Sequence, residues 1–365
     1  MKKTVKKIFK VLGIVLGVIL LVLIAYIFYL YASYHRIEDN LVLEVESAPD
    51  AGEDLEGLTS GARPDSASAR YNTALTTGET YSALTYNLGF GAYTPDFSFF
   101  MDGGRSSWAK SKESVQNTIQ GAGELIASYE PDFALLQEVD LDSTRSYHVN
   151  EYSILKTCLS SYNSVFAQNY DSAFLFYPFT QPHGSSKSGL ALFSRYLVTD
   201  SLRRSFPVST SFSKFFDLDR CYSISRLPVD NGKELVIFEL HMSAYGNSDA
   251  IREGQIRMLA DDMQKEYEAG NYVLCGGDFN HDLKASEDDS ENRESWAYPF
   301  PDEERDSLWN SARNADMEYV PGETYTVTLD GFIISDNIEC VSYDNINTGY
   351  TYSDHDPVYL EFTLK

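Results

Sequence analysis

Residues 272–280 read YVLCGGDFN, and residues 353–359 read SDHDPVY. The first stretch is an apolar run that ends in two glycines, an acid, an aromatic residue and an amide, as a buried strand followed by a polar turn would. The second stretch places Asp354 and His355 two residues before the apolar run VYLEF, which begins at Val358. Polar clusters at the borders of apolar strands predict an α/β fold whose functional groups stand at strand ends.

Other short apolar runs have the same form. They read SALTYNL, FALLQEV, LALFSRY, ELVIFELH and DGFIIS. A helix is predicted over residues 115–129, where apolar residues recur at steps of three and four before Pro131. A second helix is predicted over residues 256–267, before Gly270. Strands that alternate with helices, together with hairpin-like stretches, favour an α/β sandwich.

The polar residues at these strand ends form one usable chemical set. In chain order they are Asn87, Glu138, His241, Asp278, Asn280, Asp330, Asp354 and His355. Glu138 and a second carboxylate can hold Mg²⁺, which prefers oxygen ligands. Water can then attack phosphorus, while the metal and an imidazolium neutralise the growing charge. A carboxylate such as Asp330 beside His355 would keep that imidazole protonated near neutral pH.

Each of these residues has a structural alternative when it is taken alone. An asparagine after a strand commonly belongs to a turn. Glu138 could satisfy a helix end, and His241 could be a hydrogen-bonded core histidine. The order and completeness of the whole set favour the functional interpretation.

The complete set resembles the endonuclease/exonuclease/phosphatase superfamily over about residues 81–365. The resemblance implies a four-layered α/β sandwich of two packed mixed β-sheets flanked by helices. It implies a metal site at Glu138, with Asn87 and Asp354 in the surrounding network, and Mg²⁺ as the cofactor, for which Mn²⁺ can substitute. It also implies that Asp278 activates water, Asn280 and His241 contact phosphate, and His355 pairs with Asp330.

One departure from the family pattern concerns the phosphate contacts. Abasic-site nucleases of this superfamily carry a tyrosine before their Ser-Gly strand motif, and here Lys187 stands in that place. Lys187 is either a phosphate contact or a surface lysine, and Arg220 and Arg226 are candidates of the same kind. The departure weakens an assignment to DNA repair. His183 and His281 are interpreted as bystanders.

The N-terminus predicts a membrane anchor. Residues 1–10 hold five lysines and no acid, and residues 11–34 carry no charge. Twenty-four helical residues span about 36 Å, enough for a bilayer core of about 30 Å. The lysines predict a cytoplasmic stub over 1–10, a signal anchor over 11–34 and an extracytoplasmic body at the cell membrane. Residues 35–80 are predicted to be an acidic linker or loosely packed lead-in, before a catalytic domain over 81–365.

Charge separates the remaining function classes. Acidic residues number 54 and basic residues 29, which gives a formal net charge of −25. A phosphodiesterase or phosphatase acting on a lipid headgroup or small phosphoester fits this surface. An extracellular nuclease is the alternative. The charge disfavours it, because each phosphate contact with DNA would need a basic residue. A non-catalytic binding protein and a Ca²⁺-binding surface protein are weaker alternatives, and no protein partner is inferred.

The acidic segment 282–306 is interpreted as a solvated insertion or a cation- or partner-binding loop.

Overall fold

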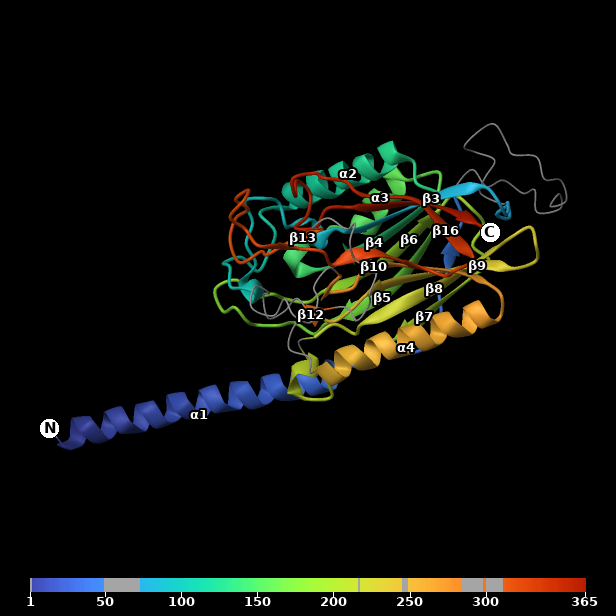
Figure 1. The fold of residues 1–365 in the computed structure, drawn as a ribbon. Helices are drawn as coiled ribbons and strands as arrows, with labels where there is room; N and C mark the ends of the chain where they lie inside the picture. The colour runs from blue at the N-terminus through green and yellow to red at the C-terminus, as the bar shows by residue number, and fades with distance from the viewer. Residues whose placement is uncertain (1, 49–72, 216, 245–248, 284–297, 300–310) are drawn as a thin grey trace.

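The computed structural model describes residues 2–48, 73–215, 217–244, 249–283, 298–299 and 311–365 (Figure 1). Two large sheets form its centre. The first has the strand order β16–β17–β3–β4–β6–β5–β2, and the second has the order β1–β7–β8–β9–β10–β15. Two short pairs, β11–β12 and β13–β14, lie outside them.

The strands of the first sheet are β16 (Ile338–Asn345), β17 (Val358–Leu364), β3 (Thr80–Asn87), β4 (Phe133–Asp140), β6 (Lys187–Ser194), β5 (Asn163–Asp171) and β2 (Val45–Glu46). Those of the second are β1 (Leu41–Val42), β7 (Asp200–Ser205), β8 (Cys221–Pro228), β9 (Glu234–His241), β10 (Tyr272–Asp278) and β15 (Asp330–Ile334). The short pairs are β11 (His281–Asp282) with β12 (Tyr298–Pro299), and β13 (Ala312–Arg313) with β14 (Thr326–Val327). The α-helices are α1 (Lys2–Ser33), α2 (Lys112–Tyr129), α3 (Glu151–Cys158) and α4 (Asp249–Glu268).

Three apolar layers hold the elements together. One cluster joins the two sheets and includes Phe133 and Leu274. A second packs α2 and α3 on the first sheet, and a third packs α4 on the second sheet. This arrangement confirms the predicted four-layered α/β sandwich, and the two predicted helices correspond to α2 and α4.

Two parallel strand pairs decide where the site lies. β3 and β4 are parallel, as are β9 and β10, whereas the other pairs within the two sheets are antiparallel. Helix α2 connects the first parallel pair and α4 connects the second, as parallel strands require a long crossover. The carboxyl ends of the two strands of each pair therefore lie next to each other.

The described residues at the start of the predicted lead-in, 35–48, pack against the body. Val42 and Leu41 pair with β7, and Val45 and Glu46 pair with β5, so this stretch adds an edge strand to each sheet. The buried Arg203 side chain donates to the carbonyl of Glu38 at 3.1 Å. Short alternating segments such as LVLEVE (residues 41–46) can pair with an open sheet edge. Sequence analysis did not predict these strands, because it interpreted the acidic composition of the whole segment as that of a linker.

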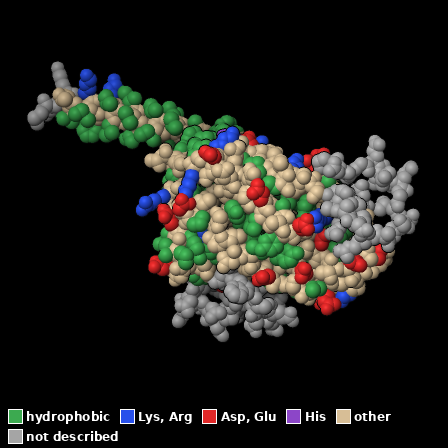
Figure 2. Space-filling model, turned by 90° about the horizontal axis from the view of Figure 1, so that it is seen from above, with side chains coloured by type: hydrophobic (Ala, Val, Ile, Leu, Met, Phe, Trp, Pro, Cys, Tyr) green, Lys and Arg blue, Asp and Glu red, His purple; other side chains and the backbone are tan. Residues whose placement is uncertain are grey.

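Helix α1 projects from the body, and Figure 2 shows its apolar surface with lysines toward the free end. Among the described residues, Thr4–Ser33 is the one segment long and apolar enough to cross a membrane, with a mean hydropathy of 3.1. The helix begins at Lys2, so it also includes most of the predicted basic stub. All four cysteines are free.

Candidate active site

A cleft of about 80 Å³ lies at the carboxyl ends of β3, β4, β9 and β10. Its lining residues are Asn87, Tyr93, Asp102, Glu138, Arg220, His241, Ala244, Asp278, Asn280, Ala312, Arg313, Asn314, Ala315, Leu329, Asp354 and His355. The structure thus brings together seven of the eight polar residues that sequence analysis placed at strand ends. The eighth, Asp330, is fully buried and reaches the cleft through His355.

Strand alternation explains why three of these side chains enter the space between the sheets. Side chains on one face of a strand recur every second residue. Leu235 and Ile237 face the other sheet, and His241 follows them at the same parity. Leu274 places Asp278 on this face in the same way. On β3, Ala83 faces the other sheet, and Asn87 has the same parity, so its side chain lies on that face too.

Glu138 reaches the cleft through an irregularity in β4. The pairing of β4 with β6 shifts register between Leu136 and Val139, and Glu138 has a φ of 55°. Glu138 has the parity of Leu136, which packs toward the outer helices. A bulge with a left-handed residue breaks the alternation and re-aims the side chain. Such a conformation costs about 1 kcal/mol or more in a non-glycine residue, which is typical of functional positions.

Asp278 is the central acceptor of the cleft. Its Oδ1 accepts the backbone N–H of Asn280 at 2.8 Å, and its Oδ2 accepts the Asn87 side-chain amide at 2.9 Å. The Nε2 atoms of His241 and His355 lie 3.5 Å and 3.9 Å from the same Oδ2. Burial raises the pKa of Asp278 to about 7, although His355 opposes the shift. A carboxylate with that pKa can take a proton near neutral pH.

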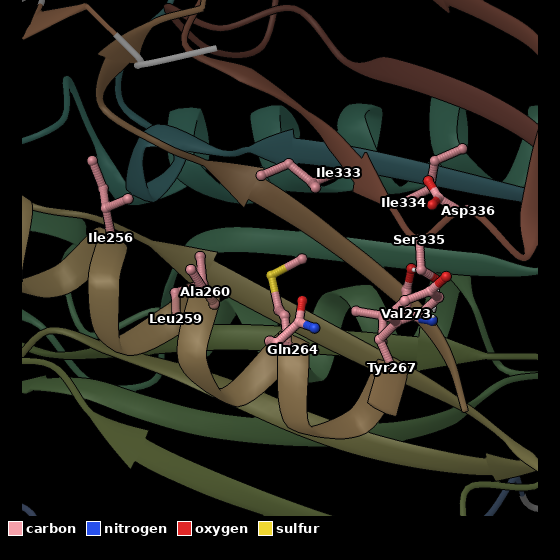
Figure 3. Close-up of a pocket in the computed structure, with 11 residues that line it drawn as sticks. Ile256, Leu259, Ala260, Gln264, Tyr267, Val273, Ile333, Ile334, Ser335 and Asp336 are labelled. Carbon is pink, nitrogen blue, oxygen red and sulfur yellow. Dashed lines mark hydrogen bonds between the residues drawn. The ribbon is translucent and has the colours of Figure 1, made fainter. Parts of the chain in front are cut away.

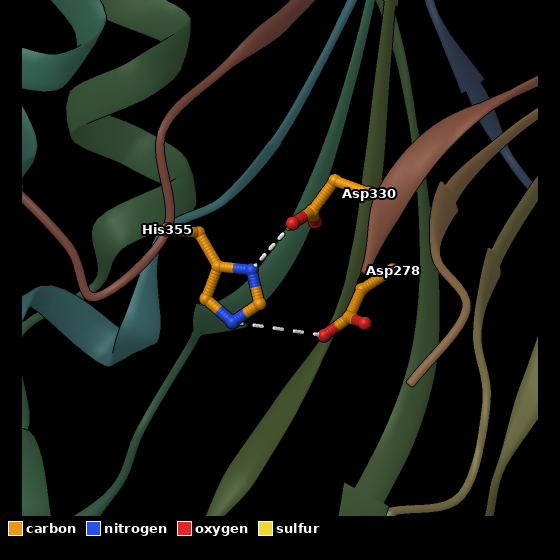
Figure 4. Close-up of side chains that lie close together, drawn as sticks. All are labelled: Asp278, Asp330 and His355. Carbon is orange, nitrogen blue, oxygen red and sulfur yellow. Dashed lines mark hydrogen bonds and ion pairs between the residues drawn. The ribbon is translucent and has the colours of Figure 1, made fainter. Parts of the chain in front are cut away.

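His355 and Asp330 form a buried pair (Figure 4). The Nδ1 atom of His355 lies 2.7 Å from Oδ2 of Asp330, and the hydroxyl of Ser311 donates to the same oxygen at 2.8 Å. Burial alone would lower the pKa of His355, but Asp330 and Asp278 hold it well above its ordinary value. The imidazole is therefore a cation that points its Nε2 atom into the cleft.

His241 has the opposite electrostatic character. Burial, with help from Arg220 and His355, lowers its pKa well below the ordinary value. No hydrogen bond to its Nδ1 atom is found within the described part of the chain. His241 is therefore neutral, and the imidazolium is His355, the histidine for which sequence analysis predicted it beside Asp330.

The donor set in the cleft fits a divalent cation that prefers oxygen ligands. Glu138 Oε1 lies 3.4 Å from the Asn87 amide nitrogen, and the Asp278 carboxylate binds the same nitrogen from the other side. Burial raises the pKa of Asp354 as well, so the cleft gathers carboxylates that a cation would stabilise in ionised form. Ligand atoms of Asp278, Asp330 and His355 also lie within 4.8 Å of one another. Because Asp330 already occupies Nδ1 of His355 and the Asn87 Oδ1 accepts the Gly89 N–H at 3.0 Å, the carboxylate oxygens of Glu138 and Asp354 fit Mg²⁺ better.

The structure separates the three basic candidates. Arg220 lines the cleft with an exposed fraction of 6%, and its Nε and one terminal nitrogen have no hydrogen-bond partner within the described residues. Arg226 instead pairs with Glu234 at 2.8 Å and with Glu266 of α4. Lys187 is exposed at the start of β6 and does not line the cleft. The structure therefore places Arg220 in the cleft and Lys187 and Arg226 outside it.

Two further residues of the site carried no motif in the sequence. Arg313 is buried, donates to the carbonyls of Tyr93 and Thr94, and holds the loop after β3 against the rim of the cleft. Ser311 fixes Asp330. Both follow the acidic segment, most of which lies outside the described residues, and only three-dimensional proximity identifies them. The predicted bystander His183 does not line the cleft, and His281 lies in β11.

A larger hollow of about 320 Å³ lies elsewhere, between α4 and strands β10 and β15 (Figure 3). Its lining is mainly apolar and includes Leu259, Met263 and Ile333. None of the residues predicted for catalysis lines it. The convergence of carboxylates, imidazoles and an arginine makes the smaller cleft the candidate active site.

This fold and this cleft define a class of phosphoester hydrolases, and comparison with known proteins identifies the family. The model of the Endonuclease/Exonuclease/phosphatase family matches residues 84–355. The chain therefore belongs to this family and is a phosphoester hydrolase. No curated protein matches the chain.

Several solved structures share the fold. An endonuclease/exonuclease/phosphatase from Beutenbergia cavernae is 14% identical, with a TM-score of 0.53 over 78% of this chain and 72% of its own. One from Bacteroides vulgatus is 16% identical, with a TM-score of 0.51 over 79% of this chain and 100% of its own. ANGEL2, described as a 2′,3′-cyclic phosphatase, is 12% identical, with a TM-score of 0.52 over 78% of this chain and 96% of its own. At these identities the similarity shows the fold alone.

Proposed function

We propose that this protein is a membrane-anchored, extracytoplasmic, Mg²⁺-dependent phosphodiesterase or phosphatase. Its substrate is a lipid headgroup or a small phosphoester, which it hydrolyses by attack of water on phosphorus. The observation that carries this proposal is the convergence of Glu138, Asp278 and His355 on one cleft beside Arg220, two of whose nitrogens have no hydrogen-bond partner among the described residues. The apolar helix α1 supports the anchor, and the lysines at its start support a cytoplasmic N-terminus.

The residues of the cleft suit the separate tasks of this reaction. Asp278 accepts the proton of the attacking water, for which its pKa of about 7 is suited. The His355 imidazolium and the Arg220 guanidinium stabilise negative charge on the phosphoryl oxygens. His241, being neutral, donates a hydrogen bond rather than charge. Because His355 Nε2 and Asp278 Oδ2 lie 3.9 Å apart, one ligand oxygen can approach from the side and hydrogen-bond both.

Glu138 would hold the metal ion, with Asn87 and Asp354 in the network around it. Mg²⁺, or Mn²⁺ in its place, supplies a Lewis acid that lowers the pKa of water and neutralises phosphoryl charge. Asp354 stands beside this group with a raised pKa, where it can protonate the leaving oxygen or a water next to it. Asn280 donates one amide hydrogen to the Met242 carbonyl at 2.9 Å, which fixes the side chain at the cleft wall.

The metal requirement is the first test. The full-length chain, purified in detergent, should lose hydrolysis of bis(4-nitrophenyl) phosphate in EDTA and recover it with Mg²⁺ or Mn²⁺. Glu138→Gln should raise the metal concentration needed or abolish activity. Asp278→Asn, which keeps the shape but removes the basic oxygen, should lower kcat by about 10²–10⁴. Full activity in EDTA would exclude this mechanism.

A substrate panel is the second test. A phospholipid, a sphingolipid, an inositol phosphate and DNA should be offered with and without Mg²⁺. Preferred turnover of a lipid or small phosphoester supports the proposal, and preferred turnover of DNA supports the nuclease alternative. Failure of every phosphoester with every metal would favour a non-catalytic binding protein.

A further inference from the structure

The outer end of α1 packs against one loop of the body. Tyr26 Oη donates to the carbonyl of Phe174 at 3.3 Å, and the backbone N–H of Phe174 donates to Tyr29 Oη at 3.0 Å. The ring of Phe176 lies edge-on to Tyr26, with centroids 5.1 Å apart. Leu30, Leu175 and Phe215 bury one another at the same junction. The body is therefore docked on the helix rather than joined to it by a free tether.

The same loop displays aromatic side chains to the outside. Residues 174–179 read FLFYPF, and the exposed fractions are 49% for Phe176, 63% for Tyr177 and 84% for Phe179. Phe212, beside the buried Phe215, is 50% exposed. Single exposed apolar residues are ordinary, but several large rings gathered at one place mark an interaction surface.

The length of α1 sets the level of this surface relative to a bilayer. Tyr26 to Tyr34 contact the body, which leaves Thr4–Ala25 as the free part of the helix. Lys6, Lys7 and Lys10 belong to the basic stub, so the uncharged free part is residues 11–25, which rise only about 22 Å. A bilayer core of about 30 Å therefore reaches Tyr26, and also Phe176, whose ring contacts it. Aromatic rings are the side chains most favoured at that depth.

The aromatic loop is also linked to the cleft. Tyr177 packs on Phe100, with ring centroids 5.9 Å apart, and Phe100 begins a short turn that ends at Asp102. Asp102 lines the cleft. In Figure 1, α1 leaves the body on the side where the loop after β3 and the loop around residue 180 project. The cleft and the aromatic loop therefore lie toward the same side as the helix.

We infer that Phe176, Tyr177 and Phe179 insert into the bilayer that α1 spans and hold the cleft against it. The substrate is accordingly a phospholipid of the same membrane, whose headgroup enters the cleft without leaving the bilayer. This inference rests on the proposed function. It adds a second membrane contact, made by the body itself, and narrows the substrate from soluble or lipid phosphoesters to membrane-embedded ones.

Depth-dependent quenching tests the insertion without requiring catalysis. Phe179→Trp and the control Val341→Trp, on the distant strand β16 and 53% exposed, are made in the full-length chain. Both are reconstituted in phosphatidylcholine nanodiscs with and without brominated lipid, and the signal of the unsubstituted chain is subtracted. We expect strong quenching of the Phe179→Trp signal and none of the Val341→Trp signal. Equal quenching at both positions overturns the inference, as does quenching at neither.

Catalysis supplies an independent readout. Phe176→Ser combined with Phe179→Ser, which leaves the contact of Tyr177 with Phe100 in place, should lower hydrolysis of nanodisc phospholipid by roughly tenfold, because two rings lose their place in the interface. Hydrolysis of bis(4-nitrophenyl) phosphate should stay unchanged. An equal loss on both substrates would show that the loop supports the cleft itself, which overturns the membrane role. Quenching without any phosphoesterase activity would contradict the proposed function and leave the membrane contact established.

A second copy of the chain is the competing occupant of the aromatic loop. Nanodiscs that hold one copy each separate the two cases. Quenching that persists with one copy per disc supports the bilayer. Quenching that disappears, together with cross-linking between copies at higher density, would assign the loop to self-association and overturn the inference.

Discussion

Asp330 affects the cleft through a single hydrogen bond to His355, and this makes it a positioning residue. Asp330→Asn keeps the size of the side chain but removes the charge that raises the pKa of His355. We expect kcat to fall by about 10²–10⁴ with little change in KM, the range found when a catalytic proton or charge is misplaced. Steady-state kinetics of the variant would measure this.

The pH profile distinguishes this role from a structural one. Because the pKa of His355 is raised, its positive charge persists to higher pH and is lost as the pH rises through that value. In Asp330→Asn the alkaline loss of activity should therefore begin at lower pH. The control Asp344→Asn, an exposed change on β16, should leave the profile in place. An unchanged alkaline limb in Asp330→Asn would remove His355 from the mechanism.

Arg220 and Arg226 form a matched pair for testing phosphate binding. Arg220→Met removes a buried guanidinium from the cleft, so kcat/KM should fall by about 10². Thermal stability should hold or rise, because two of its nitrogens have no hydrogen-bond partner in the described part of the chain. Arg226→Met breaks two ion pairs under α4, so it should cost about 1 kcal/mol of stability and leave kcat/KM unchanged. If both variants kept full activity, Arg220 would have no part in substrate binding.

These two arginines also show how far sequence reaches at the scale of single residues. Asp278 and His355 stand in dense local motifs, so their chemistry could be predicted from neighbours in the chain. Arg220 directly precedes β8 and Arg226 lies within it. The residues next to them in the sequence do not indicate which of the two arginines faces the cleft. Their roles depend on α4 covering one of them, which is a tertiary fact.

At the scale of elements, strand alternation places an acid in the core. Glu239 lies between Ile237 and His241 on the face of β9 that meets the other sheet, and its exposed fraction is 1%. Burial raises its pKa well above the ordinary value, against the opposing effect of the Leu136 and Ala191 backbones and Gln137. The side chain is therefore protonated in the folded protein.

This burial makes stability depend on pH. A carboxyl whose folded pKa is raised stabilises the fold fully at low pH, and that contribution is lost as pH rises through the folded value. Each unit of difference between the folded and the unfolded pKa changes the free energy of unfolding by about 1.4 kcal/mol. Glu239→Gln should therefore flatten the decline of Tm toward alkaline pH, while Glu339→Gln on the exposed side of β16 should not. Parallel Tm curves for Glu239→Gln and the parent would contradict the assignment.

The same alternation explains what sequence could and could not predict about elements. The buried strands were visible as apolar runs, and the helices as three- and four-residue periods. The bulge at Glu138 could not be predicted from the sequence. The left-handed backbone conformation of Glu138 arises from the way β4 pairs with β6, which the sequence does not show. The edge strands β1 and β2 were missed because two-residue pairings leave almost no periodic signal.

At the scale of the whole molecule, the lysines in the first turns of α1 predict a cytoplasmic N-terminus. Protease added to intact cells should therefore remove the body, while a tag on the N-terminal stub stays protected. Lysed cells serve as the control, in which both should be digested. A body that resists digestion until lysis would reverse the orientation and place the hydrolase in the cytoplasm.

The net charge of the whole molecule distinguishes most sharply between a lipid substrate and a nucleic-acid substrate. All 54 acidic residues but only 24 of the 29 basic residues follow residue 34, so the body repels a polyanion at long range. A phospholipid headgroup needs only the local field of the metal, His355 and Arg220, which the cleft focuses. Hydrolysis of phospholipid should therefore change only a few-fold between low and physiological salt.

DNA should show the opposite dependence on salt. If plasmid DNA is cut at all, cutting should be slow and should improve as salt screens repulsion beyond about 8–10 Å. An enzyme evolved for DNA gains affinity from phosphate contacts, so its activity falls steeply with salt on a log–log plot. Rates for both substrates across a salt series would decide between the two classes. Fast DNA cleavage at low salt that collapses as salt rises would refute the lipid assignment and establish the nuclease alternative.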